Sequence, residues 1–101
     1  MELKIDKVIE TVLYVSDIER ADAFYRQVLK LPAMVANERF RAYNVGDRSV
    51  LLLFIEGDSL RGAQYPTGFI PAHDGVGPAH IGLAVAKEQL PHWERHLVAN
   101  G

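Results

Sequence analysis

The sequence has 101 residues, a length typical of one domain, and its 49% hydrophobic and 24% charged residues are typical of a globular chain rather than a disordered one. A formal net charge of −2 argues against a nucleic-acid partner, and no apolar run approaches the ~20 residues that a membrane-spanning helix needs. Cysteine is absent, which excludes disulfides and thiolate-bound metals, and residues 1–6 lack the apolar core of a signal peptide, so we expect a cytoplasmic protein.

The first half of the chain predicts one strand, one helix and three further strands. Residues 8–15 are rich in β-branched and aromatic side chains, which favours a strand. Ser16 and Glu19 then form a capping-box pattern, and apolar residues at helical spacing predict a helix over residues 17–30 that Pro32 ends. Three short antiparallel strands are predicted to follow, over residues 33–36, 40–45 and 50–55.

The side chains of the first strand alternate between two faces of the predicted sheet. Leu13 and Val15 are expected beneath the helix, which would pack on this face through Phe24 and Val28. Glu10 is expected on the opposite face, because strand residues an odd number of positions apart point in opposite directions.

The second half of the chain repeats the start of the first half. Residues 57–78 are interrupted by glycine and proline throughout, which predicts a functional loop or a linker. Residues 79–86 then predict a strand, and residues 87–99 predict an amphipathic helix. An offset of seventy residues superposes this pair on the first strand and helix, and it places His80 on Glu10.

Glu10 and His80 are the candidate metal ligands. A carboxylate and an imidazole that face one cavity are a common start for a divalent metal site, and an inward carboxylate needs a cation or strong donors. The alternatives are a solvent-facing Glu10 on an edge strand and a hydrogen-bonded His80 in the core. Three protein ligands are usual in an open catalytic site, and Glu56 and His73 are the further candidates in this sequence.

A substrate pocket is predicted on the same face as these ligands. Gly82 and Ala84 follow His80 at alternate positions and are too small to fill a core, which would leave room for a ligand. The apolar wall of the pocket is expected from the first and fourth strands, namely Val12, Tyr14, Leu52 and Phe54.

Other motifs of catalysis and cofactor binding are missing from the sequence. It has no glycine-rich phosphate loop, no dinucleotide-binding fingerprint and no nucleophile elbow, so no organic cofactor is expected and no catalytic residue is assigned. His92 and His96 are one helical turn apart, but Trp93 stands where the zincin motif has glutamate. Both histidines are therefore predicted on the solvated face of the second helix.

With these residues identified, the sequence resembles the vicinal oxygen chelate superfamily, which includes glyoxalases, bleomycin-resistance proteins and extradiol dioxygenases. The matching segments keep the order and spacing of the family over residues 10–18, 23–26, 28–32, 51–54 and 71–85. The resemblance implies an α+β fold of paired βαβββ modules around a divalent metal, with a ligand opening the first strand of each module, here Glu10 and His80. It places Leu52 where glyoxalase I-like members have a carboxylate, which argues against their four-ligand metal site. It places Lys30 where glycine often ends the helix.

The resemblance implies a single domain over residues 1–101. Residues 7–56 would form a complete module, residues 57–78 a loop or linker, and residues 79–101 the first strand and helix of a second module. The last strand of that module, which this chain does not include, would supply the third metal ligand. We therefore expect a weakly bound or absent metal in a chain of this length, with Mn²⁺, Fe²⁺, Ni²⁺ and Zn²⁺ as the candidates.

Two functions are expected from these features. The first is a small metal-dependent enzyme, a lyase, dioxygenase or transferase, that acts on a substrate with two adjacent oxygens. The second is a metal-free protein that binds and sequesters a flat or hydrophobic small molecule, in the manner of bleomycin-resistance proteins. In either case this chain would leave one apolar sheet face uncovered, which predicts a homodimer.

Overall fold

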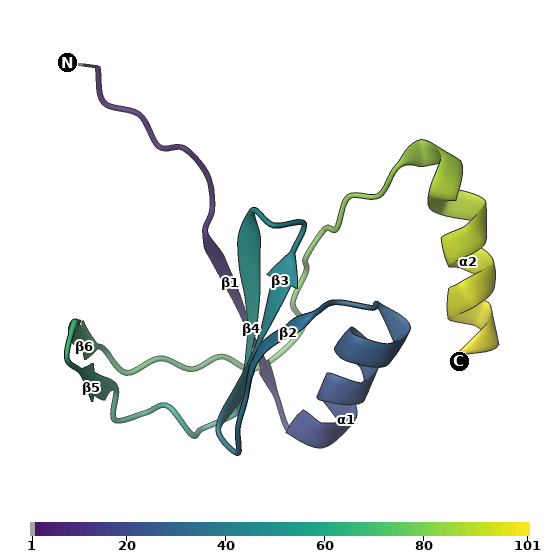
Figure 1. Ribbon diagram of the computed structural model, residues 1–101. Coiled ribbons are helices and arrows are strands. Elements are labelled where there is room, and N and C mark those ends of the chain that lie inside the picture. The colour runs from purple at the N-terminus through teal and green to yellow at the C-terminus, as the bar shows by residue number, and fades with distance from the viewer. Residues whose placement is uncertain (1) are drawn as a thin grey trace.

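The computed structural model describes residues 2–101, and a mixed four-stranded sheet forms its centre (Figure 1). The strands lie in the order β1-β4-β3-β2, with β1 parallel to β4 and the other neighbours antiparallel. Their bounds are Glu10–Val15 for β1, Ala33–Ala36 for β2, Phe40–Val45 for β3 and Ser49–Ile55 for β4. Helix α1 (Ile18–Ala23) continues into a π-helical segment (Phe24–Val28) and covers one face of the sheet, which confirms the predicted α+β class.

The hydrophobic core lies between the sheet and α1. Tyr43, Leu51 and Leu53 are almost completely buried, because alternate residues of β3 and β4 point to the helix-covered face. Leu13 and Val15 of β1 pack against this cluster, so they lie beneath the helix as predicted. The residues between them point to the other face of the sheet.

The helix contacts the sheet through residues other than those predicted. Ala21 and Tyr25 pack against the core cluster, and the ring of Tyr25 lies 6.1 Å from that of Tyr43. Phe24 is 43% exposed, so the prediction that it anchors the helix is wrong. The wider π-helical winding begins at Phe24, and it turns Tyr25 rather than Phe24 toward the sheet.

Two tight turns use left-handed backbone conformations. Gly46 and Asp47 lie in the three-residue loop that joins β3 to β4, with φ values of 62° and 58°, and the Arg48 N–H closes this turn by donating to the Val45 carbonyl at 3.3 Å. Lys30 follows the π-helical segment with φ 61°, where a non-glycine residue costs about 1 kcal/mol relative to glycine.

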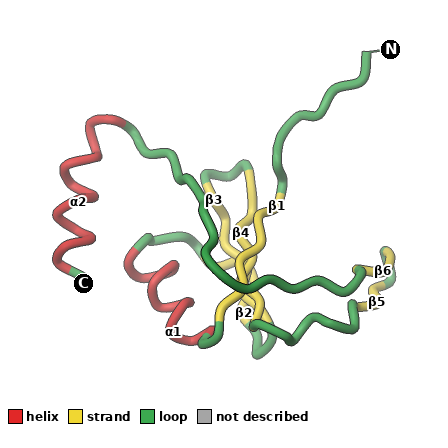
Figure 2. Tube along the Cα trace, turned by 180° about the vertical axis from the view of Figure 1, so that it is seen from behind, coloured by secondary structure: helices red, strands yellow, loops and turns green. Residues whose placement is uncertain are grey.

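The second half of the chain departs from the sheet on both sides (Figure 2). Residues 57–78, predicted as a loop, contain a two-stranded hairpin of β5 (Ala63–Tyr65) and β6 (Gly68–Ile70), which we call the arm. Figures 1 and 2 agree that the arm and α1 lie on opposite sides of the sheet.

The segment after the arm differs from the prediction in one element. Residues 79–86 pair with no other strand in the described chain, because a strand forms only where a neighbouring strand takes up its backbone hydrogen bonds. The predicted second helix is present as a 3-10 turn (Lys87–Gln89) followed by α2 (Leu90–Ala99), with Pro91 in its first turn. Within residues 2–101 no helix has the length and apolarity to cross a membrane.

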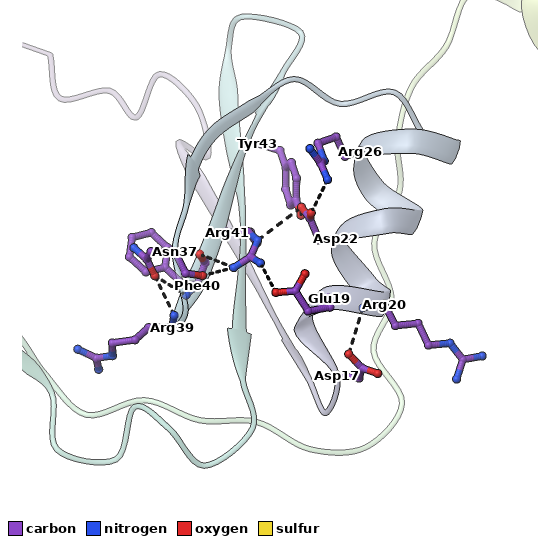
Figure 3. A network of polar contacts seen from close by, with 10 residues as sticks. All are labelled: Asp17, Glu19, Arg20, Asp22, Arg26, Asn37, Arg39, Phe40, Arg41 and Tyr43. Atoms are coloured by element: carbon purple, nitrogen blue, oxygen red, sulfur yellow. Dashed lines mark hydrogen bonds and ion pairs between the residues drawn. The ribbon is translucent and has the colours of Figure 1, made fainter.

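A buried polar network joins α1 to β3 (Figure 3). The Tyr43 hydroxyl donates to Asp22 at 2.5 Å, and Asp22 also pairs with Arg26 at 3.0 Å. Arg41 donates to Glu19 at 2.9 Å, and it contacts the backbone carbonyl of the β2–β3 turn. Its Nε atom lies 3.7 Å from the Asp22 carboxylate, which is an ion-pair distance but too long for a hydrogen bond. Arg41 and Asp22 thus form a buried charge pair with incomplete hydrogen bonding.

Tyr43 makes the stability of this network sensitive to alkaline pH. Burial, and then the hydrogen bond to Asp22, raises the pKa of Tyr43 above its usual value. The folded state therefore holds this proton more tightly than the unfolded chain, and the resulting stabilisation is complete below about pH 10 and is lost above it. Urea unfolding from about pH 8 to about pH 11 should show this decline, and Tyr43→Phe should show a shallower one. Equal slopes for both proteins would contradict the assignment.

Candidate functional site

A cavity of about 520 Å³ lies on the sheet face opposite α1. Its floor follows from the parallel register of β1 and β4, which places Val12 beside Leu52 and Tyr14 beside Phe54. The arm and the segment after it close the other side, and the remaining lining residues are Glu10, Arg39, Phe40, Ser59, Gly62, Ala63, Tyr65, Thr67, Ile70 and His73. The volume is within the range of sites that bind small molecules.

Aromatic rings form the wall of the cavity. Phe40 and Phe54 are stacked with their centroids 5.3 Å apart, since these residues are paired across β3 and β4. His73 meets Phe54 edge-on at 4.7 Å, and the Tyr14 ring lies 6.4 Å from Phe54. Such a wall suits a flat or apolar ligand group.

One polar pair interrupts this wall. The Tyr14 hydroxyl lies 2.6 Å from Nδ1 of His73. Burial, and then the charge of Asp74, raises the pKa of Tyr14. Asp74 is held in place by the backbone N–H of Gly57, which donates to its carboxylate at 3.0 Å.

The chain packs closely beside this pair at Gly75. A Cβ atom at that position would lie 2.9 Å from the Tyr14 ring, closer than side chains approach in proteins. Glycine at position 75 therefore allows the His73 segment to approach β1.

Charged groups are few in the cavity. Glu10 contributes a carboxylate, and within residues 2–101 it makes no ion pair. Arg39 is the cation of the lining, and its Nε lies 3.9 Å from the carboxylate of Asp58. Glu10 is an exposed residue, so water as well as a bound cation or donor can reach its carboxylate at the side of the cavity.

The structure brings together one part of the residue set predicted from the sequence. Glu10, Val12, Tyr14, Leu52 and Phe54 line the same cavity. The other predicted site residues, His80, Gly82 and Ala84, are exposed and are not among its lining residues, and neither is Glu56. No three His, Asp or Glu side chains of residues 2–101 gather in a way that could hold a metal ion.

Sequence reasoning missed the parts of the cavity that come from outside β1 and β4. Phe40 was available from the strand pairing, because a hairpin turn at residues 46–48 sets it opposite Phe54. His73 was considered only as a metal ligand, and its contact with Tyr14 joins residues 59 positions apart, for which the sequence carries no signal.

A second, smaller cavity of about 310 Å³ separates α2 from the end of the π-helical segment. Its lining residues are Lys30, Gln89, His92, Trp93 and His96. His96 is half-buried, and its Nε2 lies 2.7 Å from the backbone carbonyl of Val28. The prediction of a solvated His96 is therefore wrong, because a helix end leaves carbonyl groups free to accept such a hydrogen bond.

Comparisons with known proteins identify a family model and solved structures that are similar to this chain. The family model described as Glyoxalase/Bleomycin resistance protein/Dioxygenase superfamily matches residues 5–101. The crystal structure of a lactoylglutathione lyase from Agrobacterium tumefaciens is 31% identical with a TM-score of 0.81, and the match covers 96% of this chain and 71% of that one. No curated protein sequence matches the chain.

Two further solved structures share the fold at lower identity. An integron cassette protein from the mobile metagenome of the Halifax Harbour sewage outfall is 18% identical with a TM-score of 0.71, over 96% of this chain and 72% of that chain. The structure of a possible glyoxalase from Bacillus cereus is 20% identical with a TM-score of 0.63, over 94% and 74% of the two chains.

Proposed function

The chain belongs to the Glyoxalase/Bleomycin resistance protein/Dioxygenase superfamily, and from this premise we propose that it is a small metal-dependent enzyme acting on a substrate with two adjacent oxygens. The observation that carries the proposal is the carboxylate of Glu10, which faces an aromatic cavity and has no ion-pair partner in the described chain. Glu10 is an exposed residue, so its carboxylate is accessible to a cation that enters the cavity from solvent.

The proposed metal ligands are Glu10 and His80. A carboxylate and an imidazole suit Mn²⁺, Fe²⁺, Ni²⁺ or Zn²⁺, and His80 is exposed, so its ring is accessible to a metal. The Nδ1 atom of His73 is engaged by Tyr14, so we leave His73 out of the ligand set. A divalent ion held by these residues would supply Lewis-acid polarisation of the two substrate oxygens.

The cavity residues would bind and orient the substrate. The rings of Phe40 and Phe54 exclude water and hold its apolar part, while Arg39 offers a cation at the side. The relative that is 31% identical is a lactoylglutathione lyase, so we propose a lyase of this kind, with a dioxygenase or a transferase as the other reactions of the superfamily.

Metal analysis with matched variants tests this function. In a protein that has the third ligand in place, Glu10→Gln and His80→Ala should each lose stoichiometric metal while their circular dichroism stays that of the wild type, because each removes one ligand and no core contact. Both should also lose activity on methylglyoxal mixed with glutathione, whose adduct is an isomer of lactoylglutathione and carries two adjacent oxygens. His92→Ala, at an exposed histidine of α2, should keep the wild-type metal content. A Glu10→Gln protein that keeps its metal would contradict the assignment of Glu10 as a metal ligand.

The aromatic wall supports a second candidate function, metal-free binding of a flat or hydrophobic compound. This function predicts that bleomycin binds with equal affinity to the wild type and to Glu10→Gln in the presence of a chelator. Under the metal-dependent function, bleomycin should not bind to the protein in the presence of the chelator. Calorimetric titration of both proteins separates the two candidates.

Two further properties stay predictions. Helix α2 exposes apolar side chains, among them Leu90, Leu97 and Val98, which supports the expected homodimer. The cytoplasmic location rests on the sequence alone.

A further inference from the structure

Tyr14 and His73 form a hydrogen-bonded polar pair in the aromatic wall of the cavity. The two side chains come from β1 and from the segment after the arm, and their hydrogen bond of 2.6 Å is short. We propose that Tyr14 and His73 act together as the base that removes a proton from the carbon beside the two substrate oxygens. This inference rests on the proposed function, since it assigns the proton transfer at the same site.

The direction of the hydrogen bond follows from the acidity of the two groups. A phenol O–H is a stronger acid than a neutral imidazole N–H, and an imidazole nitrogen is a better acceptor than a phenol oxygen. Tyr14 therefore donates to Nδ1 of His73, and the His73 proton resides on Nε2. This arrangement leaves lone pairs of the Tyr14 oxygen free to accept a proton from a ligand in the cavity.

Tyr14 accepts the substrate proton as it gives its own proton to His73, so it does not become a tyrosinate. Partial burial and the charge of Asp74 raise its pKa, so a tyrosinate is unfavourable at this position. The Gly57 N–H donates to this carboxylate and fixes its position. The remaining charged groups of the cavity are Glu10 and Arg39, the latter paired with Asp58.

The proposed step conserves protons and electrons. The C–H bond of the substrate breaks, and its proton goes to the Tyr14 oxygen while the original Tyr14 proton moves to Nδ1 of His73. The electron pair of the broken bond stays on the substrate as an enolate over the adjacent carbonyl. Reprotonation at the neighbouring carbon, with the hydroxyl proton passing from one substrate oxygen to the other, gives the isomer. It reverses both transfers and returns the pair to its starting state.

Deuterium exchange into hydroxyacetone tests the pair directly. Hydroxyacetone has two adjacent oxygens, and loss of the proton NMR signal of its hydroxymethyl group in D₂O reports abstraction of the C–H proton. The wild-type chain should catalyse this exchange, and Tyr14→Phe should slow it about 100-fold or more at saturating hydroxyacetone, in the range of general-base contributions. The concentration for half-maximal rate should change little, because Tyr14→Phe keeps the ring that lines the cavity.

His73→Gln is the matched variant for the second half of the pair. Glutamine keeps an acceptor for the Tyr14 hydroxyl but cannot take up its proton, so exchange should fall as far as in Tyr14→Phe, and the double variant should fall no further. His92→Ala should exchange at the wild-type rate. Nitrogen NMR of His73 should show the proton on Nε2 in the wild type and a mixture of both tautomers in Tyr14→Phe.

The outcomes separate this inference from the proposed function. If metal is stoichiometric and Tyr14→Phe exchanges at the wild-type rate, the pair is not the base and the metal-dependent function stands. If the wild type exchanges hydroxyacetone without any bound metal, the pair stands and the metal-dependent function fails. A wild-type protein that exchanges no faster than buffer overturns the pair.

Discussion

Replacing Arg41 with methionine is expected to lower the free energy of unfolding by about 3–5 kcal/mol. The Arg41 and Asp22 side chains are each 7% exposed, so loss of the guanidinium leaves the Asp22 carboxylate buried with Arg26, which is half-exposed, as its remaining cation. Methionine keeps the apolar stem of the side chain, so the change reports the charge and its hydrogen bonds. Urea unfolding at neutral pH measures the loss.

Arg39→Met is the matched control for this prediction. Arg39 lies two residues away, and its side chain is 60% exposed and pairs with Asp58 only at 3.9 Å. Surface pairs of this kind are worth less than about 1 kcal/mol, so Arg39→Met should unfold close to the wild type. An Arg41→Met protein as stable as Arg39→Met would show that the network does not stabilise the fold. In that case the missing hydrogen bond at the Arg41 Nε would offset what the other contacts contribute.

Leu53→Ala is expected to destabilise the protein by about 2–5 kcal/mol. Leu53 is completely buried between the sheet and α1, so truncation removes apolar contacts and leaves a cavity in the core. Thermal and urea unfolding followed by circular dichroism give the loss directly. The Tyr14–His73 hydrogen bond should survive in the folded fraction, because the two sites lie on opposite faces.

Leu52→Ala tests the face assignment of β4. Leu52, the neighbour of Leu53, is half-buried and lines the cavity. Truncation to alanine therefore removes less buried surface than at Leu53, and it enlarges a space that is already open. The loss of stability should be clearly smaller than that of Leu53→Ala, while binding in the cavity changes. A larger loss for Leu52→Ala would mean that the strand register is shifted by one residue.

The sequence was sufficient for those parts of the fold that local pattern determines. The alternation of β1 put Leu13 and Val15 beneath the helix, and strand and turn residues set the bounds of β2 and β3 to within a residue. These features depend on the alternation of side chains between the two faces of a strand, which can be read from consecutive residues. The winding of the helix was not accessible in this way, because the π-helical turn that favours Tyr25 over Phe24 depends on packing against the finished sheet.

Pairing between distant segments was the part that sequence could not supply. The segment that contains the arm is rich in glycine and proline, which predicts a loop, although β5 and β6 pair across a short turn. Residues 79–86 have the composition of a strand but no neighbour to bond with in the described chain. The candidate site shows the same division, since Val12, Tyr14, Leu52 and Phe54 follow from the alternation of β1 and β4, whereas the contact of His73 required the arm to fold back over the sheet.

The parallel pairing of β1 with β4 has a consequence for the order in which the chain folds. The β3–β4 hairpin closes across a tight turn, whereas the pairing of β1 with β4 closes a loop that contains residues 16–48. Closing that longer loop has the larger entropic cost, so β1 is expected to dock after the hairpin has formed. Glu10 and Tyr14 belong to β1, the strand expected to dock last. The cavity floor therefore forms only when β1 pairs with β4. A chain arrested before that event would keep its hairpin and lack a binding site.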